Sequence, residues 1–361
     1  MEEKTKHFER PTTNRPPSLF NLTFWAVFVG LIAGFGGYLV ANYFLPANSV
    51  NYFNSSNTPT DIKINLEQPL TNFAKKQSAN VAGVYKAVQP IAAVGEPVFS
   101  QADFLGSAIV VTSDGWLMTT NQVVKNSQAK VVLGDRIYDI VDLKEDKFSG
   151  VVFIKIDGNL LSPVNFQFTD DAKVGETLFS NIDIPTSIDH AFYVSTLSSN
   201  HFILNKYLST DSIDYYLKIA DSKASMGAPY FNMNGELLGL VYKIGEDSLL
   251  IPAEYLKQAI KNLLNGTERV IAGISYLDME NNSGFNRKGV LIYNPGQTAL
   301  TYNLPGQKAG LKVNDQLVAV NNDIITSTRS LTSILQNYRP GDQVIIKVLR
   351  DNQEIDINLS L

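Results

Sequence analysis

An uncharged, apolar stretch near the N-terminus constrains this chain more than any other feature. No charged residue occurs between Pro16 and Thr60, and within this window residues 22–41 form a 20-residue segment with Thr23 as its one clearly polar side chain. An α-helix of this length spans about 30 Å, which matches the hydrocarbon core of a bilayer. The sequence therefore predicts a transmembrane helix, which we assign to residues 20–45.

The basic residues around this segment indicate its orientation. Lys63 alone lies within 20 residues after Pro46, whereas residues 1–19 contain four basic side chains: Lys4, Lys6, Arg10 and Arg15. Basic residues favour the cytoplasmic side, so we expect residues 1–19 to be a cytoplasmic tail. A single-pass anchor in the cell membrane would follow, and the main domains would lie on the outer side of the membrane. A cleaved signal peptide is the alternative, but its apolar region has only about 7–15 residues.

The composition excludes several classes of protein. Hydrophobic residues make up 44% and charged residues 18%, so the chain can bury a large core. A formal net charge of −5 gives no electrostatic basis for binding nucleic acid. The absence of cysteine removes thiolate nucleophiles, disulfides and cysteine-ligated metal sites, and we expect no metal or cofactor. Any mechanism that needs a histidine must use His7, His190 or His201.

Residues 46–80 open with Asn, Ser and Thr and are expected to form a linker. From residue 81 to 266, short apolar runs alternate with turn residues, which is typical of antiparallel barrels or sandwiches. A helix is predicted at residues 252–264, ending at Gly266. The predicted strands are residues 106–112, 116–120, 129–133, 151–156, 177–181, 192–197, 215–219 and 236–242.

Residues 267–361 show a different pattern. A helix with one apolar face is predicted at residues 330–338, and the flanking segments alternate in hydrophobicity as strands do. The segment therefore predicts a small α+β domain. Its expected strands are residues 289–293, 314–321, 343–349 and 354–361.

Five segments in the middle of the chain carry motifs in a characteristic order and spacing: residues 105–124 (LGSAIVVTSDGWLMTTNQVV), 147–157 (KFSGVVFIKID), 173–176 (KVGE), 224–242 (ASMGAPYFNMNGELLGLVY) and 250–264. In these motifs the chain resembles the HtrA/Deg-type, trypsin-like serine proteases. The resemblance implies that residues 81–266 form two six-stranded β-barrels. The whole chain would then be mostly β, with a trypsin-like double β-barrel followed by an α+β PDZ domain and preceded by a transmembrane helix.

All three catalytic positions of this family are changed here. The resemblance places Gln122 at the position of the histidine, Gly150 at that of the aspartate and Met226 at that of the serine. Acyl transfer needs a hydroxyl nucleophile, a base that takes its proton and a carboxylate that orients the base. An amide does not accept a proton near neutral pH, and a thioether cannot form an acyl-enzyme. We therefore expect a degenerate triad without hydrolytic activity.

An alternative alignment keeps a nucleophile. It makes Ser225 the fallback serine, but His190 and His201 lie away from the position of the family's histidine and are expected to be exposed loop or strand residues. A Ser–Lys dyad with Lys223 or Lys125 is conceivable, although nothing in the spacing favours it. The alternative function is thus an active serine endopeptidase with a relocated or atypical catalytic apparatus.

Residues 267–361 resemble the PDZ domains that follow HtrA barrels, above all in the AGL and NDQLVAVNN sequences. PDZ domains bind a partner's C-terminus as an added strand and hold its carboxylate with backbone amides. Serine or tyrosine stands here where the carboxylate-binding loop usually has glycine, and the same apolar residues would also suit the core of a small domain. The candidate peptide-binding residues are Ile274, Ser275, Tyr276, Leu277, Leu331, Ile334 and Leu335.

We interpret the chain as a membrane-anchored, extracytoplasmic HtrA-like pseudoprotease. It would bind peptides or protein C-termini at the PDZ domain and act as a scaffold, sensor or chaperone-like factor in envelope protein quality control. The expected partners are the lipid bilayer at residues 20–45, C-terminal peptides, and either further copies in a homotrimer or an active paralogue. No nucleic acid is expected. A purely structural anchor that binds no peptide is the remaining alternative.

Overall fold

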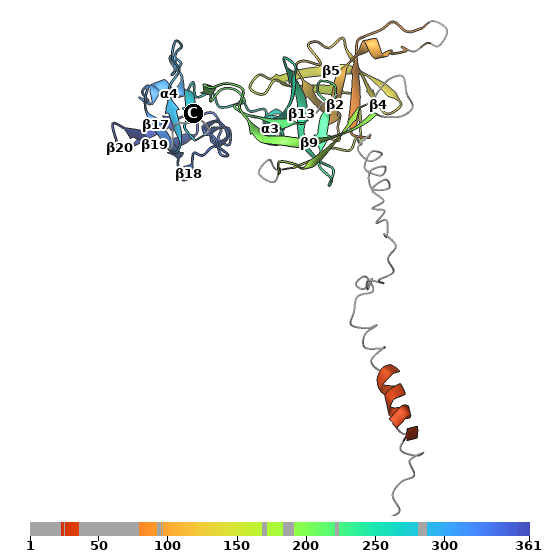
Figure 1. Ribbon diagram of the computed structural model, residues 1–361. Helices are drawn as coiled ribbons and strands as arrows, with labels where there is room; N and C mark the ends of the chain where they lie inside the picture. Colours follow the sequence, from red (N-terminus) through yellow and green to blue (C-terminus); the bar gives the residue numbers. More distant parts are fainter. Residues whose placement is uncertain are drawn as a thin grey trace, which may run out of the picture. The chain divides into compact units, whose positions relative to one another are not determined.

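The computed structural model describes residues 23–24, 26–35, 79–91, 95, 97–167, 172–182, 191–220, 224–280 and 287–361. Backbone contacts divide the chain into two units, Met1–Ile64 and Asn65–Leu361. In the first unit, residues 23–24 and 26–35 are helical with exposed side chains (red in Figure 1). Among the described residues, no helix is long and apolar enough to cross a membrane. The rest of the predicted anchor, residues 20–45, lies outside the described part.

The first described part of the second unit is a closed six-stranded barrel, in the order β1-β2-β3-β6-β5-β4. Gly115 makes the sharp turn before β3, because its φ is +105° and a Cβ there would lie 2.4 Å from the Ile156 carbonyl oxygen. A short 3₁₀ helix, Gln101–Asp103, leads into β2. The strands are β1 (Val81–Tyr85), β2 (Phe104–Val110), β3 (Trp116–Thr120), β4 (Lys130–Leu133), β5 (Arg136–Asp146) and β6 (Val151–Ile156).

Six further strands close a second barrel. Their order is β12-β8-β9-β11-β14-β13, and β12 pairs with β13 to complete the ring. A short strand, β7 (Asn165–Phe166), adds to β13 in parallel. The barrel strands are β8 (Thr177–Ile182), β9 (Ala191–Phe202), β11 (Tyr216–Ile219), β12 (Pro229–Phe231), β13 (Glu236–Ile244) and β14 (Asp247–Pro252).

One apolar core is shared by the two barrels. It includes Met118 from the first barrel and Leu240 from the second, each fully buried. Burial of one large apolar side chain contributes about 1.5–3 kcal/mol, so this shared core holds the barrels together. Helix α3 (Ala253–Asn265) joins it and ends at Gly266, whose φ is +62°. The buried face of α3 comprises Ala253, Tyr255, Leu256 and Ala259.

The C-terminal domain is a twisted sheet with two short helices. Its strand order is β10-β15-β16-β17-β19-β20, with β18 paired to β17. Apolar side chains of the sheet and of α5 form a separate core. The elements are β15 (Ser275–Asp278), β16 (Val290–Ile292), α4 (Pro305–Lys308), β17 (Gln316–Val320), β18 (Asp323–Ile324), α5 (Leu331–Leu335), β19 (Gln343–Arg350) and β20 (Gln353–Ser360).

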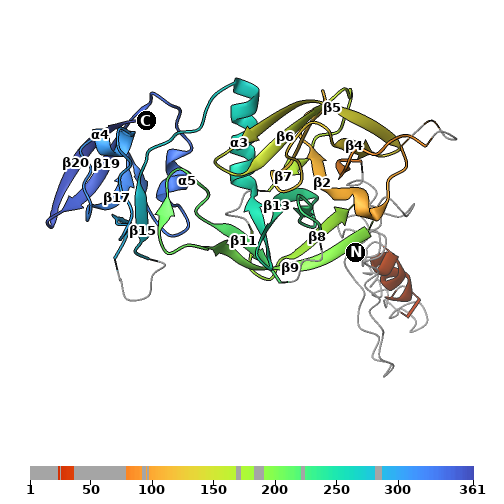
Figure 2. The same cartoon turned by 90° about the horizontal axis from the view of Figure 1, so that it is seen from above.

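One strand of this sheet comes from the barrel region. β10 (Leu208–Ser209) lies between β9 and β11 in the chain, but it pairs antiparallel with β15. Leu208 is opposite Tyr276, and Ser209 is opposite Ser275. Figure 2 shows β10 as the short light-green arrow beside β15. The barrels and the C-terminal domain are therefore joined by strand pairing as well as by the chain itself.

The predicted strands are observed, most of them with small changes in their bounds, but β9 extends five residues beyond its predicted end at residue 197. The helix predicted at residues 252–264 appears as α3, one residue displaced. The helix predicted at residues 330–338 is shorter, because α5 spans only Leu331–Leu335 and turns follow it. Ser330 caps this helix, since its side chain accepts a hydrogen bond from the Ser333 N–H.

Candidate functional site

Gln122 is held at both ends of its side-chain amide. It follows β3, and its Nε2 donates to the Lys243 carbonyl oxygen at 2.6 Å while its Oε1 accepts from the Lys243 N–H at 2.9 Å. Lys243 belongs to β13, so these two bonds connect the first barrel to the second. An amide can do this because it carries both a donor and an acceptor. The side chain thus acts as a clamp between the barrels.

Gly150 lies in the turn between β5 and β6. Its carbonyl oxygen accepts from the Asn121 N–H at 2.8 Å, so it adjoins the residue before Gln122. A Cβ at Gly150 would meet side-chain atoms of Asn121 and Tyr242 at 3.4 to 3.6 Å, which is ordinary contact. The φ of +70° nevertheless favours glycine. There is room for a side chain here, but the backbone has a conformation that a carboxylate-bearing residue adopts less readily.

Met226 lies in the loop before β12. Its carbonyl oxygen accepts from the Ser107 N–H at 3.0 Å, and its side chain packs against the core of the first barrel. Gly227 follows with a φ of +72°, and a Cβ there would lie 2.3 Å from the Ser107 carbonyl oxygen. The loop therefore passes so close to β2 that only glycine fits at residue 227.

Gln122 and Met226 line one open cavity of about 730 Å³. Gly150 adjoins it through its bond to Asn121, whose Nδ2 donates to Glu145 Oε1 at 3.2 Å. The lining is polar and of mixed charge. It consists of Asn121, Gln122, Val124, Lys125, Leu143, Lys144, Glu145, Val152 and Met226.

Ser225 has another hydroxyl as its hydrogen-bond partner. Its Oγ lies 3.1 Å from Ser107 Oγ, and a serine hydroxyl is not a base that takes a proton near neutral pH. Ser225 is not among the described residues that line the cavity, whereas Lys125 is. Lys223, the other candidate base, lies outside the described residues.

His201 is half-buried, so the expectation that it is exposed is wrong. It lies in β9 and stacks on Tyr215, with ring centroids 4.2 Å apart. Burial lowers the pKa of His201, and the charges of Asp214 and Asp278 oppose this shift only in part. His201 lines a different pocket from Gln122 and Met226. His7 and His190 lie outside the described residues.

The candidate peptide-binding residues lie on β15, just before it and on α5. Six of the seven are buried, and Ser275 is partly exposed. Five of the side chains, those of Ile274, Tyr276, Leu331, Ile334 and Leu335, belong to the apolar core of the domain, and the main chain of β15 pairs with β10. The buried residues are Ile274, Tyr276, Leu277, Leu331, Ile334 and Leu335.

Comparison with known proteins identifies related chains. Residues 273–361 match the family model of the PDZ domain. The chain is 25% identical over 282 residues to a probable periplasmic serine endoprotease, DegP-like, of Ectopseudomonas mendocina, which covers 72% of this chain and 57% of the relative. A protein of the same description from a Marinomonas species is 23% identical over 84% of this chain and 69% of its own length. The solved HtrA-type protease AlgW with a tripeptide aligns with a TM-score of 0.59 and 17% identity, over 80% of this chain and 95% of that one.

The chain resembles the HtrA-type serine proteases in sequence and in fold. The predicted fold class, a mostly β trypsin-like double barrel followed by an α+β PDZ domain, is confirmed. The chain spans little more than half the length of the first curated relative, at 57%.

A buried carboxylate connects the barrels of this HtrA-like chain to its PDZ domain. Asp214 accepts from the Tyr255 hydroxyl of α3 at 2.5 Å and from the Tyr276 hydroxyl of β15 at 2.8 Å. The Tyr276 hydroxyl also lies 2.7 Å from Thr332 Oγ1 of α5. Burial above all, and then the charge of Asp214, raise the pKa of both tyrosines well above 10.0. Both phenols therefore stay protonated and act as donors to the carboxylate.

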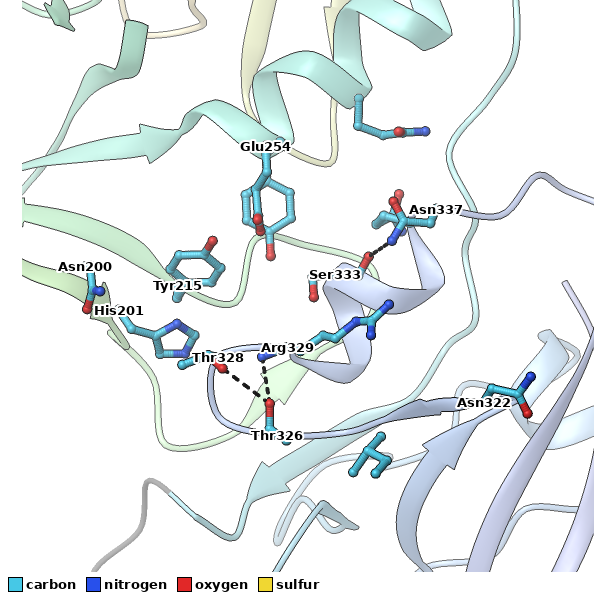
Figure 3. Close-up of a pocket in the computed structure, with 14 residues that line it drawn as sticks. Asn200, His201, Tyr215, Glu254, Asn322, Thr326, Thr328, Arg329, Ser333 and Asn337 are labelled. Carbon is cyan, nitrogen blue, oxygen red and sulfur yellow. Dashed lines mark hydrogen bonds between the residues drawn. The ribbon is translucent and has the colours of Figure 1, made fainter. Parts of the chain in front are cut away.

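A polar pocket of about 760 Å³ lies beside α5, between the PDZ domain and the second barrel (Figure 3). His201 and Tyr215 lie on the barrel side. On the PDZ side, the Arg329 N–H donates to Thr326 Oγ1 at 3.0 Å, and the guanidinium of Arg329 pairs with Asp323 at 2.8 Å. Amides and hydroxyls make up most of the lining, so the pocket suits polar groups.

Proposed function

We propose that this chain is an HtrA-like pseudoprotease that binds peptides or protein C-termini through its PDZ domain. The curated relatives are described as serine endoproteases. The observation that carries the proposal is the pair of hydrogen bonds between Gln122 and Lys243. They use both ends of the amide at the position of the family's base, which supports a structural role for this residue in place of proton transfer.

The neighbouring positions support the same proposal. Met226 offers a thioether and Gly150 no side chain, so neither an activated hydroxyl nor an orienting carboxylate accompanies Gln122. His201 is the one histidine among the described residues, and it lines the pocket beside α5. A hydroxyl–imidazole pair is therefore absent from the described part of the cleft.

We further propose where each part of the chain lies relative to the cell membrane. Residues 1–19 would be cytoplasmic, residues 20–45 the bilayer anchor and residues 46–80 a linker, and the barrels (81–266) and PDZ domain (267–361) would lie outside the membrane. The uncharged segment and the periplasmic descriptions of the relatives support this placement. The protein would act as a scaffold, sensor or chaperone-like factor in envelope protein quality control, as a homotrimer or with an active paralogue.

A direct assay separates this proposal from an atypical endopeptidase. The full chain, solubilised in detergent, is incubated with casein and with a fluorophosphonate probe. We expect neither turnover nor labelling. Labelling that Ser225→Ala abolishes and that Ser113→Ala, at an exposed turn serine, leaves intact would establish the endopeptidase instead.

A second assay tests peptide binding. A library of fluorescent peptides with free C-termini is titrated against the full chain, together with the same peptides amidated at the C-terminus. We expect binding that requires the free carboxylate, because PDZ domains hold this group with backbone amides. If every peptide binds no better than its amidated form, a purely structural anchor is the better description.

A further inference from the structure

The edge of β15 that does not pair with β16 is occupied by a segment of the same chain. β10 pairs with it antiparallel, with Leu208 opposite Tyr276 and Ser209 opposite Ser275. The pairing continues one residue further, since the Thr210 N–H donates to the Ile274 carbonyl oxygen at 3.0 Å. An added strand on a sheet edge is the mode by which extended peptides bind to domains of this kind.

The segment ends in a carboxylate that is bound by loop amides. Asp211 Oδ1 accepts from the Ala272 N–H at 2.9 Å, and both of its carboxylate oxygens lie 3.1 Å from the Gly273 nitrogen. Thr210 Oγ1 accepts from the next amide, that of Ile274, at 3.1 Å. Three consecutive N–H groups just before β15 are thus satisfied by two side chains. Backbone amides capture a peptide's terminal carboxylate in the same chemical manner.

The opposite wall is formed by α5. Thr332 Oγ1 lies 3.2 Å from the Ser209 carbonyl oxygen. Leu208 is buried and belongs to the core of the PDZ domain, where it lies with residues of β15 and α5. The segment therefore has paired backbone, a buried apolar side chain and a bound carboxylate, which are the three elements of peptide recognition by strand addition.

We infer that residues 208–211 are an intramolecular ligand of the PDZ groove, by which we mean the site between β15 and α5. The Asp211 side chain takes the role of a C-terminal carboxylate. An extended peptide with a free C-terminus must then displace this segment in order to pair with β15. The inference deepens the proposed function and rests on it for the identity of the competitor. Because only the open fraction of molecules accepts a peptide, the apparent affinity of the groove is reduced by that fraction.

Displacement of residues 208–211 would also affect the second barrel. Asp214 lies three residues after Asp211, and it is the buried carboxylate that accepts from Tyr255 and Tyr276. The same segment connects β9 to β11 of the second barrel. A peptide that replaced residues 208–211 would therefore loosen the link between α3 and β15. Occupancy of the PDZ groove would then change the conformation of the barrel loop, the segment between β9 and β11.

The natural sequence lacks cysteine, which permits a clean test by disulfide trapping. Ser209 and Ser275 are directly opposite each other, next to the hydrogen-bonded pair of Thr210 and Ile274. This is a non-hydrogen-bonded position of the antiparallel ladder, where facing Cβ atoms are close enough for a disulfide. The full-length Ser209→Cys/Ser275→Cys variant should oxidise readily and lock the segment in place. Asp211→Ala should release it, and Asp135→Ala, at an exposed turn, is the matched control.

The probe is a fluorescein-labelled peptide with the sequence of residues 205–211, amidated at its C-terminus so that the aspartate supplies its one carboxylate. We expect it to bind the Asp211→Ala chain about tenfold or more tightly than the wild-type and Asp135→Ala chains. The oxidised double-cysteine chain should not bind it, and reduction should restore wild-type binding. Equal affinity for the released, wild-type and locked chains would overturn the inference. Failure of the disulfide to form in the folded chain would also overturn it.

The library of free C-terminal peptides distinguishes this inference from the proposed function. If library peptides bind the locked chain as well as the released chain, the intramolecular ligand is refuted while PDZ binding stands. If the released chain binds the 205–211 peptide but no library peptide, the intramolecular ligand stands and capture of protein C-termini fails.

Discussion

Arg269 and Asp146 form a buried ion pair between the end of β5, in the first barrel, and the connection to the PDZ domain. Arg269 Nη2 lies 2.6 Å from Asp146 Oδ2, and the two side chains are 8% and 11% exposed. The same Nη2 donates to the Tyr255 carbonyl oxygen at 3.0 Å, and the guanidinium lies 4.7 Å from the centre of the Phe148 ring. This arginine therefore fixes the segment after α3 to both barrel and helix.

Removal of this guanidinium should destabilise the fold strongly. Arg269→Met leaves Asp146 buried without its charged partner, and breaking a buried pair in this way costs about 3–5 kcal/mol. Lys144→Met breaks an exposed pair with Asp142 and should cost about 1 kcal/mol or less. Urea unfolding of the full chain measures both. Equal losses would show that burial of the Arg269 pair does not matter.

His201 should make stability depend on pH. Burial lowers its pKa in the folded chain below the ordinary 6.5, so the unfolded chain binds more protons in the acid range. Stability from this residue is therefore complete above about pH 6.5 and declines as the pH falls through the lowered pKa. His201→Phe keeps an aromatic ring beside Tyr215 and should flatten the curve of unfolding free energy between about pH 7 and pH 5. An unchanged curve would contradict the assignment.

Tyr276→Phe should weaken the link between β15 and the barrels. It removes one donor to the buried Asp214 carboxylate, and a hydrogen bond to a charged group contributes about 1.5–3 kcal/mol. The pKa of Tyr276 is raised by folding, so its contribution is complete below about pH 10 and is lost as the pH rises further. The variant should therefore decline less steeply than wild type in alkaline unfolding experiments. Tyr302→Phe, at an 83% exposed side chain, should change neither quantity.

Gln122→His should not restore proteolysis. The imidazole would have neither a serine at residue 226 nor a carboxylate at residue 150, so casein turnover should stay at background. Loss of the two bonds to Lys243 should cost about 1–2 kcal/mol in urea unfolding. Gln128→His, at an exposed position nearby, is the control and should be neutral. Measurable turnover in Gln122→His would mean that another nucleophile reaches the cleft.

Gly227→Ala should be among the most damaging glycine substitutions. Its Cβ would lie 2.3 Å from the Ser107 carbonyl oxygen in addition to the strain of a positive φ, for a total of about 2–5 kcal/mol. Gly134 has a similar φ of +63° but no atom within 4 Å of the added Cβ, so Gly134→Ala should cost only about 1–2 kcal/mol. Thermal unfolding of the two variants isolates the cost of contact. Similar losses would indicate that the loop can move away from β2.

Much of the fold could be predicted because most strands carry their own apolar run between turn residues. β6 is an example, with all but one of its residues buried. β5 was not predicted, because most of its side chains are at least partly exposed and many are charged. β10 gives no local signal at all, since its two residues are a strand only through their pairing with β15.

The site was only partly predictable for a related reason. The motifs located Gln122 and Met226, and the structure brings both to one cavity. The clamp on Lys243 depends on backbone atoms 121 positions away, which no local pattern encodes. The role of Asp211 was missed because a single aspartate in a polar segment is common, and its significance comes from the amides of Ala272 and Gly273.

The pairing of β10 with β15 also determines where the chain can be divided into separate domains. A fragment of residues 267–361 would lose its outermost strand and leave the main chain of β15 unpaired along one side. Such an edge is a template for pairing with other chains, so the excised domain would tend to self-associate at high concentration. In the intact protein, the barrel loop acts as a cover that keeps this edge from indiscriminate pairing.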